Sequence, residues 1–183
     1  SGGRIVPYKK DSILVSIGEY RDRSRAQDNL TINGKIISVH KENGGYRIVS
    51  KGHRNPQGLS YDSIRDVILS SEHGPAGGDE INIQLNSDIK LNFGWPISSY
   101  GIHYDLLNKY GEHTADEKRL IEGAPLYKSH KEYGFVEPIK YFNQSPGLSQ
   151  VLMIEFNDKN LDFLVSTLGT INSPYVQSML HMR

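Results

Sequence analysis

Short apolar runs separated by glycine-rich breaks are the feature of this sequence that most limits its fold. Residues 12–17 form a β-branched apolar run, and residues 46–50 form a strand-like run after a Gly-Gly break. Further breaks lie at residues 52–58 and 74–78. No apolar run reaches the roughly eighteen residues that a membrane-spanning helix needs. We therefore expect short strands joined by turns, and no membrane span.

The predicted elements combine strands with helices. Strands are predicted at residues 12–17, 30–39 around an Asn33-Gly34 turn, 46–50, 81–85, 89–93 and 151–156. Helices are predicted at residues 61–71, 104–110 and 161–168, and in short segments that begin at Thr114 and Pro174. The pattern predicts the α+β class and a single domain over residues 1–183. We interpret residues 1–3 as a cloning remnant and the chain as a domain cut from a longer protein.

Composition excludes several kinds of chemistry. The chain has 183 residues, which is enough for one domain with a hydrophobic core. It contains 21 Lys and Arg against 21 Asp and Glu, so its formal charge is zero and binding to nucleic acid is not favoured. The absence of cysteine excludes disulfides, thiolate zinc sites and cysteine nucleophiles.

The segment after the first strand-like run carries a recognisable signature. Its positions are occupied by Tyr20, Arg21, Ser24, Arg25, Asp28 and Leu30, with Ala26 and Gln27 where a proline pair is usual. This pattern resembles the opening signature of ADP-ribosyltransferase toxins of the cholera and pertussis type. The resemblance implies that Arg21 binds NAD, because a guanidinium can donate two parallel hydrogen bonds to a phosphate. Ser24, Arg25 and Tyr61 would lie around the same cofactor.

Two later positions extend the resemblance in chain order. Ser60 precedes a predicted helix, where the family has a Ser-Thr-Ser segment. Residues 105–125 are similar to the family segment that carries the catalytic glutamate, which falls on Glu117. That carboxylate would stabilise positive charge as nicotinamide leaves. Arginine-specific members have a second acid two residues earlier, where this chain has Ala115, so other alignments with Glu112 or Glu122 as the catalytic acid stay open.

The resemblance implies a function and a fold. It predicts two small mixed or antiparallel sheets with flanking helices, and a catalytic triplet of Arg21, Ser60 and Glu117. The domain would be a mono-ADP-ribosyltransferase or NAD glycohydrolase of a bacterial toxin or effector, with NAD as substrate and no metal. It would be secreted or delivered into a target cell, where a protein would accept the ADP-ribose.

Simpler structural explanations exist for each of these residues. Arg21 suits a solvated turn with local ion pairs. Ser60 suits a helix N-cap, and Glu117 completes a capping box with Thr114. A catalytic role is favoured only because Arg21, Ser60 and Glu117 occur together and in the order that the family shows.

Two other functions stay open. A metal-independent toxin nuclease could use His103, His113 or His130 as general acid and base. The segment of residues 73–82, with later Asn and Trp residues, has the residue order of ββα-metal nucleases in compressed spacing. The eleven tyrosines also suit a non-catalytic binding module.

Overall fold

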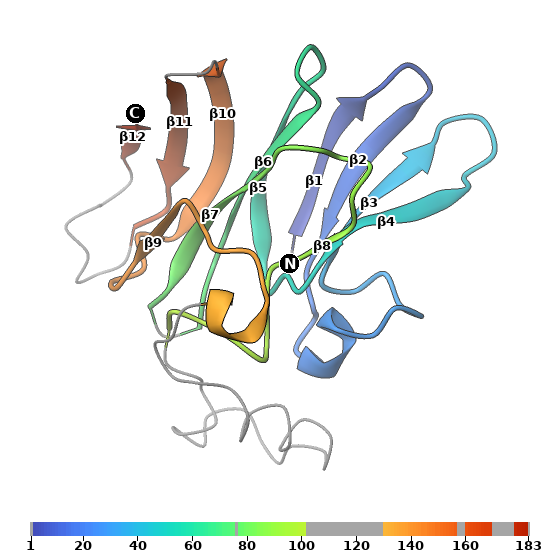
Figure 1. The fold of residues 1–183 in the computed structure, drawn as a ribbon. Helices are drawn as coiled ribbons and strands as arrows, with labels where there is room; N and C mark the ends of the chain where they lie inside the picture. Colours follow the sequence, from blue (N-terminus) through green and yellow to red (C-terminus); the bar gives the residue numbers. More distant parts are fainter. Residues whose placement is uncertain (1, 76, 102–129, 157–159, 170–177, 183) are drawn as a thin grey trace.

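The computed structural model describes residues 2–75, 77–101, 130–156, 160–169 and 178–182, whose strands form three sheets placed side by side (Figure 1). The first sheet has the order β1 (Gly2–Tyr8), β2 (Ser12–Ile17), β3 (Lys35–His40), β4 (Tyr46–Lys51) and β8 (Leu91–Asn92). The second contains β5 (Pro56–Asp62), β6 (Val67–Glu72), β7 (Asp79–Gln84) and β9 (Lys140–Phe142). The third contains β10 (Leu148–Phe156), β11 (Leu161–Thr167) and β12 (Met179–Met182). All pairs are antiparallel except β4 with β8.

The hydrophobic core lies between neighbouring sheets. β1 contacts β5, and β10 packs against β5 and β6. One cluster fills the first gap, with Tyr8, Leu14, Ile36, Val49, Leu59 and Ile68; the other contains Leu69, Ile81, Phe142, Leu148, Val151, Phe163 and Val165. Adjacent residues of β6 serve both clusters, because successive side chains of a strand point to opposite faces. Small sheets packed face to face in succession are the arrangement of neighbouring blades in a β-propeller.

The predicted α+β class is wrong, because the described residues are nearly all strand or loop. Their helical segments are the short 3-10 helices η1 (Arg23–Ala26) and η3 (His130–Tyr133). Three sheets replace the two that were expected. None of the helices within the described ranges is long and apolar enough to cross a membrane.

The predicted helix at residues 61–71 is instead the hairpin of β5 and β6. The helical spacing of Ile64, Val67 and Ile68 is coincidental, since Ile64 is 87% exposed at the turn. The Asp62 carboxylate accepts hydrogen bonds from the backbone N–H groups of Ile64 (2.8 Å) and Arg65 (3.2 Å). This local bonding favours a turn over a continuing helix.

The predicted helix at residues 161–168 is also wrong, because Leu161–Thr167 is β11. The buried residues Phe163, Val165 and Thr167 alternate with less buried ones, and the strand lies between β10 and β12. The predicted helices at 104–110, at Thr114 and after Pro174 lie outside the described residues.

Several predicted strands are confirmed. Residues 12–17 form β2, and the predicted strands at residues 46–50, 81–85 and 151–156 coincide within a few residues with β4, β7 and β10. The predicted strand at residues 30–39 is formed only from Lys35 onward, and that at residues 89–93 is reduced to two residues. Gly2 and Gly3 open β1.

Candidate active site

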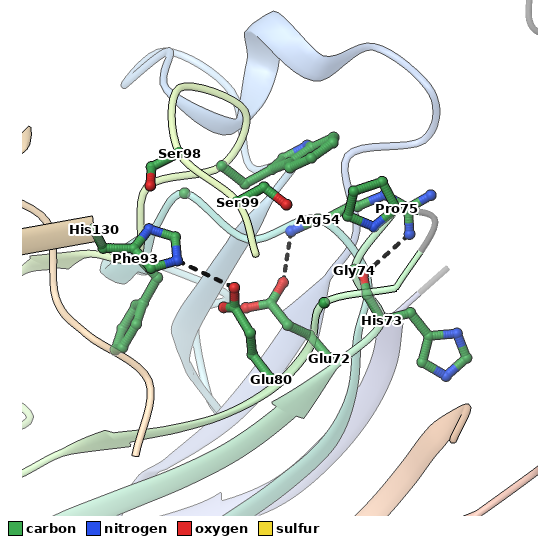
Figure 2. A pocket seen from close by; sticks show the side chains of 13 residues that line it. Arg54, Glu72, His73, Gly74, Pro75, Glu80, Phe93, Ser98, Ser99 and His130 are labelled. Atoms are coloured by element: carbon green, nitrogen blue, oxygen red, sulfur yellow. Dashed lines mark hydrogen bonds and ion pairs between the residues drawn. The ribbon is translucent and has the colours of Figure 1, made fainter. Parts of the chain in front are cut away.

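A small pocket lies at the end of the second sheet, where β5 begins, β6 ends and β7 begins (Figure 2). The loop before β5, the glycine-rich turn after β6, the loop after β8 and η3 surround it. Its volume is about 10 Å³, which is room for about one water molecule. The lining residues are Gly52, Arg54, Glu72, His73, Gly74, Pro75, Gly78, Glu80, Phe93, Trp95, Ser98, Ser99 and His130.

Two glutamates form the floor of this pocket. Glu72 on β6 is in register with Glu80 on β7, so both side chains lie on the same face of the sheet. Asn82 follows two residues after Glu80 and therefore shares this face. Its Nδ2 donates to Glu72 Oε1 at 3.1 Å and to Glu80 Oε2 at 3.4 Å. The two carboxyl groups are thus joined through one amide.

A histidine flanks each glutamate. His53, in the loop before β5, places Nδ1 2.9 Å from Glu72 Oε1 and Nε2 2.8 Å from Ser50 Oγ. His130, on η3, places Nε2 3.1 Å from Glu80 Oε1 (Figure 2). Both histidines are buried, so each contact is shielded from water. The result is a continuous buried chain of two imidazoles and two carboxyl groups.

The two carboxyl groups differ in their electrostatic surroundings. Burial alone would raise the pKa of Glu72, but His53 and the Arg54 backbone N–H outweigh it and the pKa is lowered. Burial raises the pKa of Glu80, and the nearby charge of Glu72 acts in the same direction. Two interacting carboxyl groups with opposite shifts are typical of functional sites.

Trp95 and Arg54 line one side of the pocket, and a second arginine, Arg23, which is not part of the lining, lies against the same indole. The guanidinium carbon of Arg54 lies 5.5 Å from the centre of the Trp95 ring, and that of Arg23 lies 5.8 Å from it. Arg54 Nη1 donates to the His73 carbonyl at 3.0 Å, and its backbone N–H donates to Glu72 Oε2 at 2.7 Å (Figure 2). Arg54 is therefore held both through its backbone and through its side chain.

Glu19 adds a carboxyl group behind the two arginines. Its backbone N–H donates to the Arg54 carbonyl at 2.9 Å, and its side chain is buried. Burial raises the pKa of Glu19, although the charges of Arg54 and Arg23 partly oppose this shift. The positive charge of the two arginines is therefore partly balanced by the carboxyl group of Glu19.

A glycine is required beside His130. Gly94 has a φ of +92°, which side chains larger than hydrogen rarely adopt. A Cβ atom at this position would also collide with His130 Nδ1 and lie 3.1 Å from a ring carbon of Phe135. The glycine in the loop after β8 thus lets η3 close onto the pocket.

The residues predicted around Arg21 form a local turn outside the pocket. Arg21 is exposed, has a φ of +66°, and donates its backbone N–H to the Glu19 carboxylate. Ser24 Oγ donates to Asp22 Oδ1 at 2.7 Å, and Arg25 Nε lies 2.5 Å from Asp22 Oδ2. These contacts agree with the simpler interpretation of this segment as a turn with local ion pairs.

Ser60 and Tyr61 lie on β5, toward the end opposite the pocket. Ser60 Oγ accepts a hydrogen bond from the Met153 backbone N–H at 3.3 Å, so the N-cap interpretation of Ser60 is wrong. The Tyr61 ring packs against Tyr8, and its hydroxyl donates to Asp66 at 2.8 Å. The structure does not bring these residues to Arg21.

The remaining candidates fall largely outside the described ranges. Glu117, its alternatives Glu112 and Glu122, Ala115, His103 and His113 all lie there. His130 is among the described residues. Its Nε2 makes a hydrogen bond with a buried glutamate, so this nitrogen does not face a basic groove that could bind phosphate. Within the described residues, no group of three or more His, Asp or Glu side chains could hold a metal ion.

The comparison with known proteins identifies the class. The family model described as glucose/sorbosone dehydrogenase matches residues 1–171. The chain therefore belongs to the glucose/sorbosone dehydrogenase family.

Individual relatives agree with this assignment. The chain is 31% identical over 161 residues to the aldose sugar dehydrogenase YliI of Escherichia coli, covering 81% of this chain and 38% of that protein. Quinoprotein glucose dehydrogenase B of Acinetobacter calcoaceticus is 30% identical over 132 residues, covering 65% and 25%. The crystal structure of the soluble E. coli aldose sugar dehydrogenase in its apo-form has a TM-score of 0.66 and 27% identity, covering 91% and 48%. The chain thus spans about half the length of this solved structure. It spans a smaller share, 38% and 25%, of the two curated relatives.

The structure of the PQQ-bound aldose sugar dehydrogenase from Streptomyces coelicolor shares the fold, with a TM-score of 0.59 at 20% identity, and covers 99% of this chain and 48% of that one. Family membership overturns the ADP-ribosyltransferase resemblance, and with it the toxin function, the transferase or glycohydrolase activity and NAD as substrate. The nuclease and binding-module alternatives have no support either. A six-residue signature in a polar turn was too short to identify a family.

Some pocket residues were predicted, but for another chemistry: His130 as a nuclease acid or base, and residues 73–82 as a nuclease motif. Glu72, Arg54 and Trp95 were not predicted as site residues of this pocket. The available signal was the pair of glutamates, Glu72 and Glu80, on either side of a glycine-rich turn between two strands. Arg54 and Trp95 gave no such signal, because only the tertiary fold brings them together.

Proposed function

We propose that this chain forms part of a sugar dehydrogenase that uses pyrroloquinoline quinone (PQQ). Family membership over residues 1–171 and the names of the relatives support an oxidoreductase acting on aldoses. The observation that carries the proposal is that Arg54 and Trp95 line a pocket with a buried carboxyl floor, with the Arg54 guanidinium against the indole.

The chemistry of this group of side chains fits PQQ, which is a planar quinone with three carboxylate groups. Guanidinium groups bind carboxylates through two parallel hydrogen bonds, and an indole offers a flat face to a planar ring. The pocket, which is partly open and about 10 Å³ in volume, is far smaller than such a molecule. PQQ would therefore be held at the mouth of the pocket, where Arg54 could bind one of its carboxylates.

The residues of this chain would have distinct roles. Bound PQQ would supply the two-electron acceptor for oxidation of the sugar. Arg54 would bind and orient a cofactor carboxylate, because its guanidinium is already directed by the His73 carbonyl. Trp95 would exclude water from the ring face. Glu72 would fix the Arg54 backbone through its 2.7 Å hydrogen bond.

Binding and activity can be tested separately in the full protein. Trp95 is the only tryptophan of this chain, so PQQ binding at the proposed place should quench its fluorescence. We expect Arg54→Lys to weaken PQQ binding by about tenfold or more, because lysine keeps the charge but loses the planar fork. The matched control is Arg65→Lys, which changes an exposed arginine at the far turn of the same sheet.

Aldose-dependent reduction of an artificial electron acceptor should require PQQ. In Arg54→Lys this activity should decrease together with the affinity for PQQ. Equal PQQ affinity in the two lysine variants would refute the role of Arg54. The absence of both quenching and sugar oxidation in the wild-type protein would refute the proposed function.

A further inference from the structure

The buried chain of His53, Glu72, Asn82, Glu80 and His130 contains more titratable groups than cofactor binding needs. All five residues are buried, with at most 7% of their surface exposed. The contact between Glu80 and His130 joins η3 to the sheet. Their hydrogen bonding indicates which of the two glutamates carries the negative charge.

The two carboxyl groups receive unequal numbers of hydrogen bonds. Glu72 accepts from Arg54 N at 2.7 Å and from Asn82 Nδ2 at 3.1 Å, and lies 2.9 Å from His53 Nδ1. Glu80 has the His130 ring at 3.1 Å and only a long contact of 3.4 Å with Asn82. A buried carboxylate needs several donors to stay charged, so the negative charge belongs on Glu72. A second charge on the adjacent Glu80 would be both poorly solvated and repelled.

The environment of His130 indicates its own protonation. Nδ1 has no hydrogen-bond partner among the described residues and packs over Gly94. A charged imidazolium would bury an unmatched N–H at Nδ1, which is costly. A neutral ring avoids burying that charge: either Nε2–H donates to Glu80 Oε1, or the carboxylic O–H of Glu80 donates to Nε2.

We propose that Glu80 is a neutral carboxylic acid at neutral pH, and that its hydrogen bond with a neutral His130 latches η3 onto the sheet beside the pocket. Glu80 then acts as a positioning residue: it holds His130 and, through it, the η3 side of the pocket. The latch is a property of the folded chain and needs no bound cofactor.

Charged and titratable groups surround this latch from every neighbouring element. They are His53 and Arg54 before β5, Glu72 on β6, Tyr100 after β8, Glu137 after η3 and Tyr141 on β9. The Tyr100 ring lies edge-on to His130 with centroids 5.1 Å apart, and its hydroxyl donates to Glu137 at 2.5 Å. Ionised Glu72 and Glu137 both disfavour further negative charge here.

These surroundings fix the sign of the pH dependence. Burial raises the pKa of Glu80. Burial alone would lower the pKa of His130, but its contact with Glu80 outweighs burial and raises that pKa, so the two groups together take up a proton more readily than they would apart. The pair therefore holds one proton more tightly in the folded state than in the unfolded state. Its stabilising contribution is complete at low pH and is lost as pH rises through the folded-state pKa. Alkaline pH should thus open the latch.

The test follows the Glu80 carboxyl carbon by NMR and the hydrogen-exchange protection of two amides near η3, in the full protein. Phe135 N donates to the His130 carbonyl and Val136 N to the Asn92 carbonyl, both at 3.0 Å. In the wild type we expect protection at these amides to fall by about tenfold as pH rises from about 6 to about 9. In Glu80→Gln, protection should stay constant, because the amide keeps the acceptor and cannot ionise.

The matched control is Glu132→Gln, which alters an exposed glutamate on η3 itself and should follow the wild type. The proposal is overturned if the Glu80 carboxyl carbon titrates in the ordinary range of glutamate, or if Glu80→Gln loses protection with pH as the wild type does. The carboxyl measurement uses the wild-type protein and therefore decides the matter even if Glu80→Gln fails to fold. Neither readout depends on PQQ, so failure here is distinguishable from failure of the proposed function.

Discussion

Lys35 shows how a single buried cation holds a loop onto a sheet. Its side chain is 0% exposed, and Nζ donates to the carbonyls of Arg25 (2.7 Å), Asn33 (2.7 Å) and Ala26 (3.1 Å). A lysine ammonium has three donors, so each finds an acceptor. All three carbonyls belong to the connection between β2 and β3 that carries η1. The loop beside the pocket is thus anchored by one side chain of the first sheet.

Replacing Lys35 with methionine should destabilise the protein, since methionine fills the space but leaves three carbonyls without their donor. We expect the free energy of unfolding in urea to fall by about 3 kcal/mol. Lys90→Met is the control, because exposed Lys90 makes one 3.3 Å hydrogen bond and should cost less than about 0.5 kcal/mol. Similar losses in the two variants would contradict this role of Lys35.

The difference in stability between the wild type and Lys35→Met should depend on pH. Burial, and then the charge of Lys51, lowers the pKa of Lys35 from 10.5 to about 8. The unfolded state therefore holds this proton more tightly between the two values. As pH rises through that window, the stability of the wild type relative to Lys35→Met should increase. The prediction would be contradicted if urea unfolding showed this relative stability to decrease across the window. The fold would then favour the charged ammonium over the neutral amine.

At the scale of elements, β5 requires a glycine where β10 crosses it. A Cβ atom on Gly58 would lie 2.8 Å from Val151 N and would collide with Ser71 Oγ and with the Ser149 carbonyl oxygen. Two of these three atoms belong to the backbone of β10 and cannot move away independently. The close packing of the second and third sheets therefore depends on the absence of a side chain.

Gly58→Ala should push β10 away from β5. We expect a loss of about 2 to 3 kcal/mol in the free energy of unfolding, because overpacking against backbone atoms forces the strands apart. Gly45→Ala is the control at an exposed hairpin turn, where a Cβ would meet only the Asn43 side chain. A Gly58→Ala protein as stable as Gly45→Ala would mean that the two sheets can separate at little cost.

The sequence predicts those elements whose pattern has a single interpretation. The β-branched run of β2 is such a case, and its bounds are confirmed at both ends. Residues 61–71 and 161–168 satisfy helical spacing by chance, and the hairpin turn at Asp62 and the strand partners of β11 override it. The site was less predictable, because Arg54, Trp95 and His130 are distant in sequence and are brought to one pocket by two loops and η3.

At the scale of the whole molecule, one carboxylate joins the second sheet to the third. Asp79 opens β7 and is fully buried. Its Oδ2 accepts from Gly147 N (2.9 Å) and Leu148 N (3.0 Å), at the start of β10. Its Oδ1 accepts from Ser145 Oγ (2.6 Å) and Gly74 N (3.1 Å), so the pocket turn shares the same anchor.

Asp79→Ala should therefore loosen the third sheet and the turn after β6, because four donors, two of them buried, lose one acceptor. We expect the amides of Gly147 and Leu148 to exchange with solvent about tenfold faster or more, while those of β2 and β3 keep their protection. Asp88→Ala removes an exposed carboxylate that pairs with Lys9 and should leave both regions unchanged. Equal acceleration in all three sheets would show that Asp79 supports global stability and not this junction, since an anchor between two sheets acts first on the sheets that it joins.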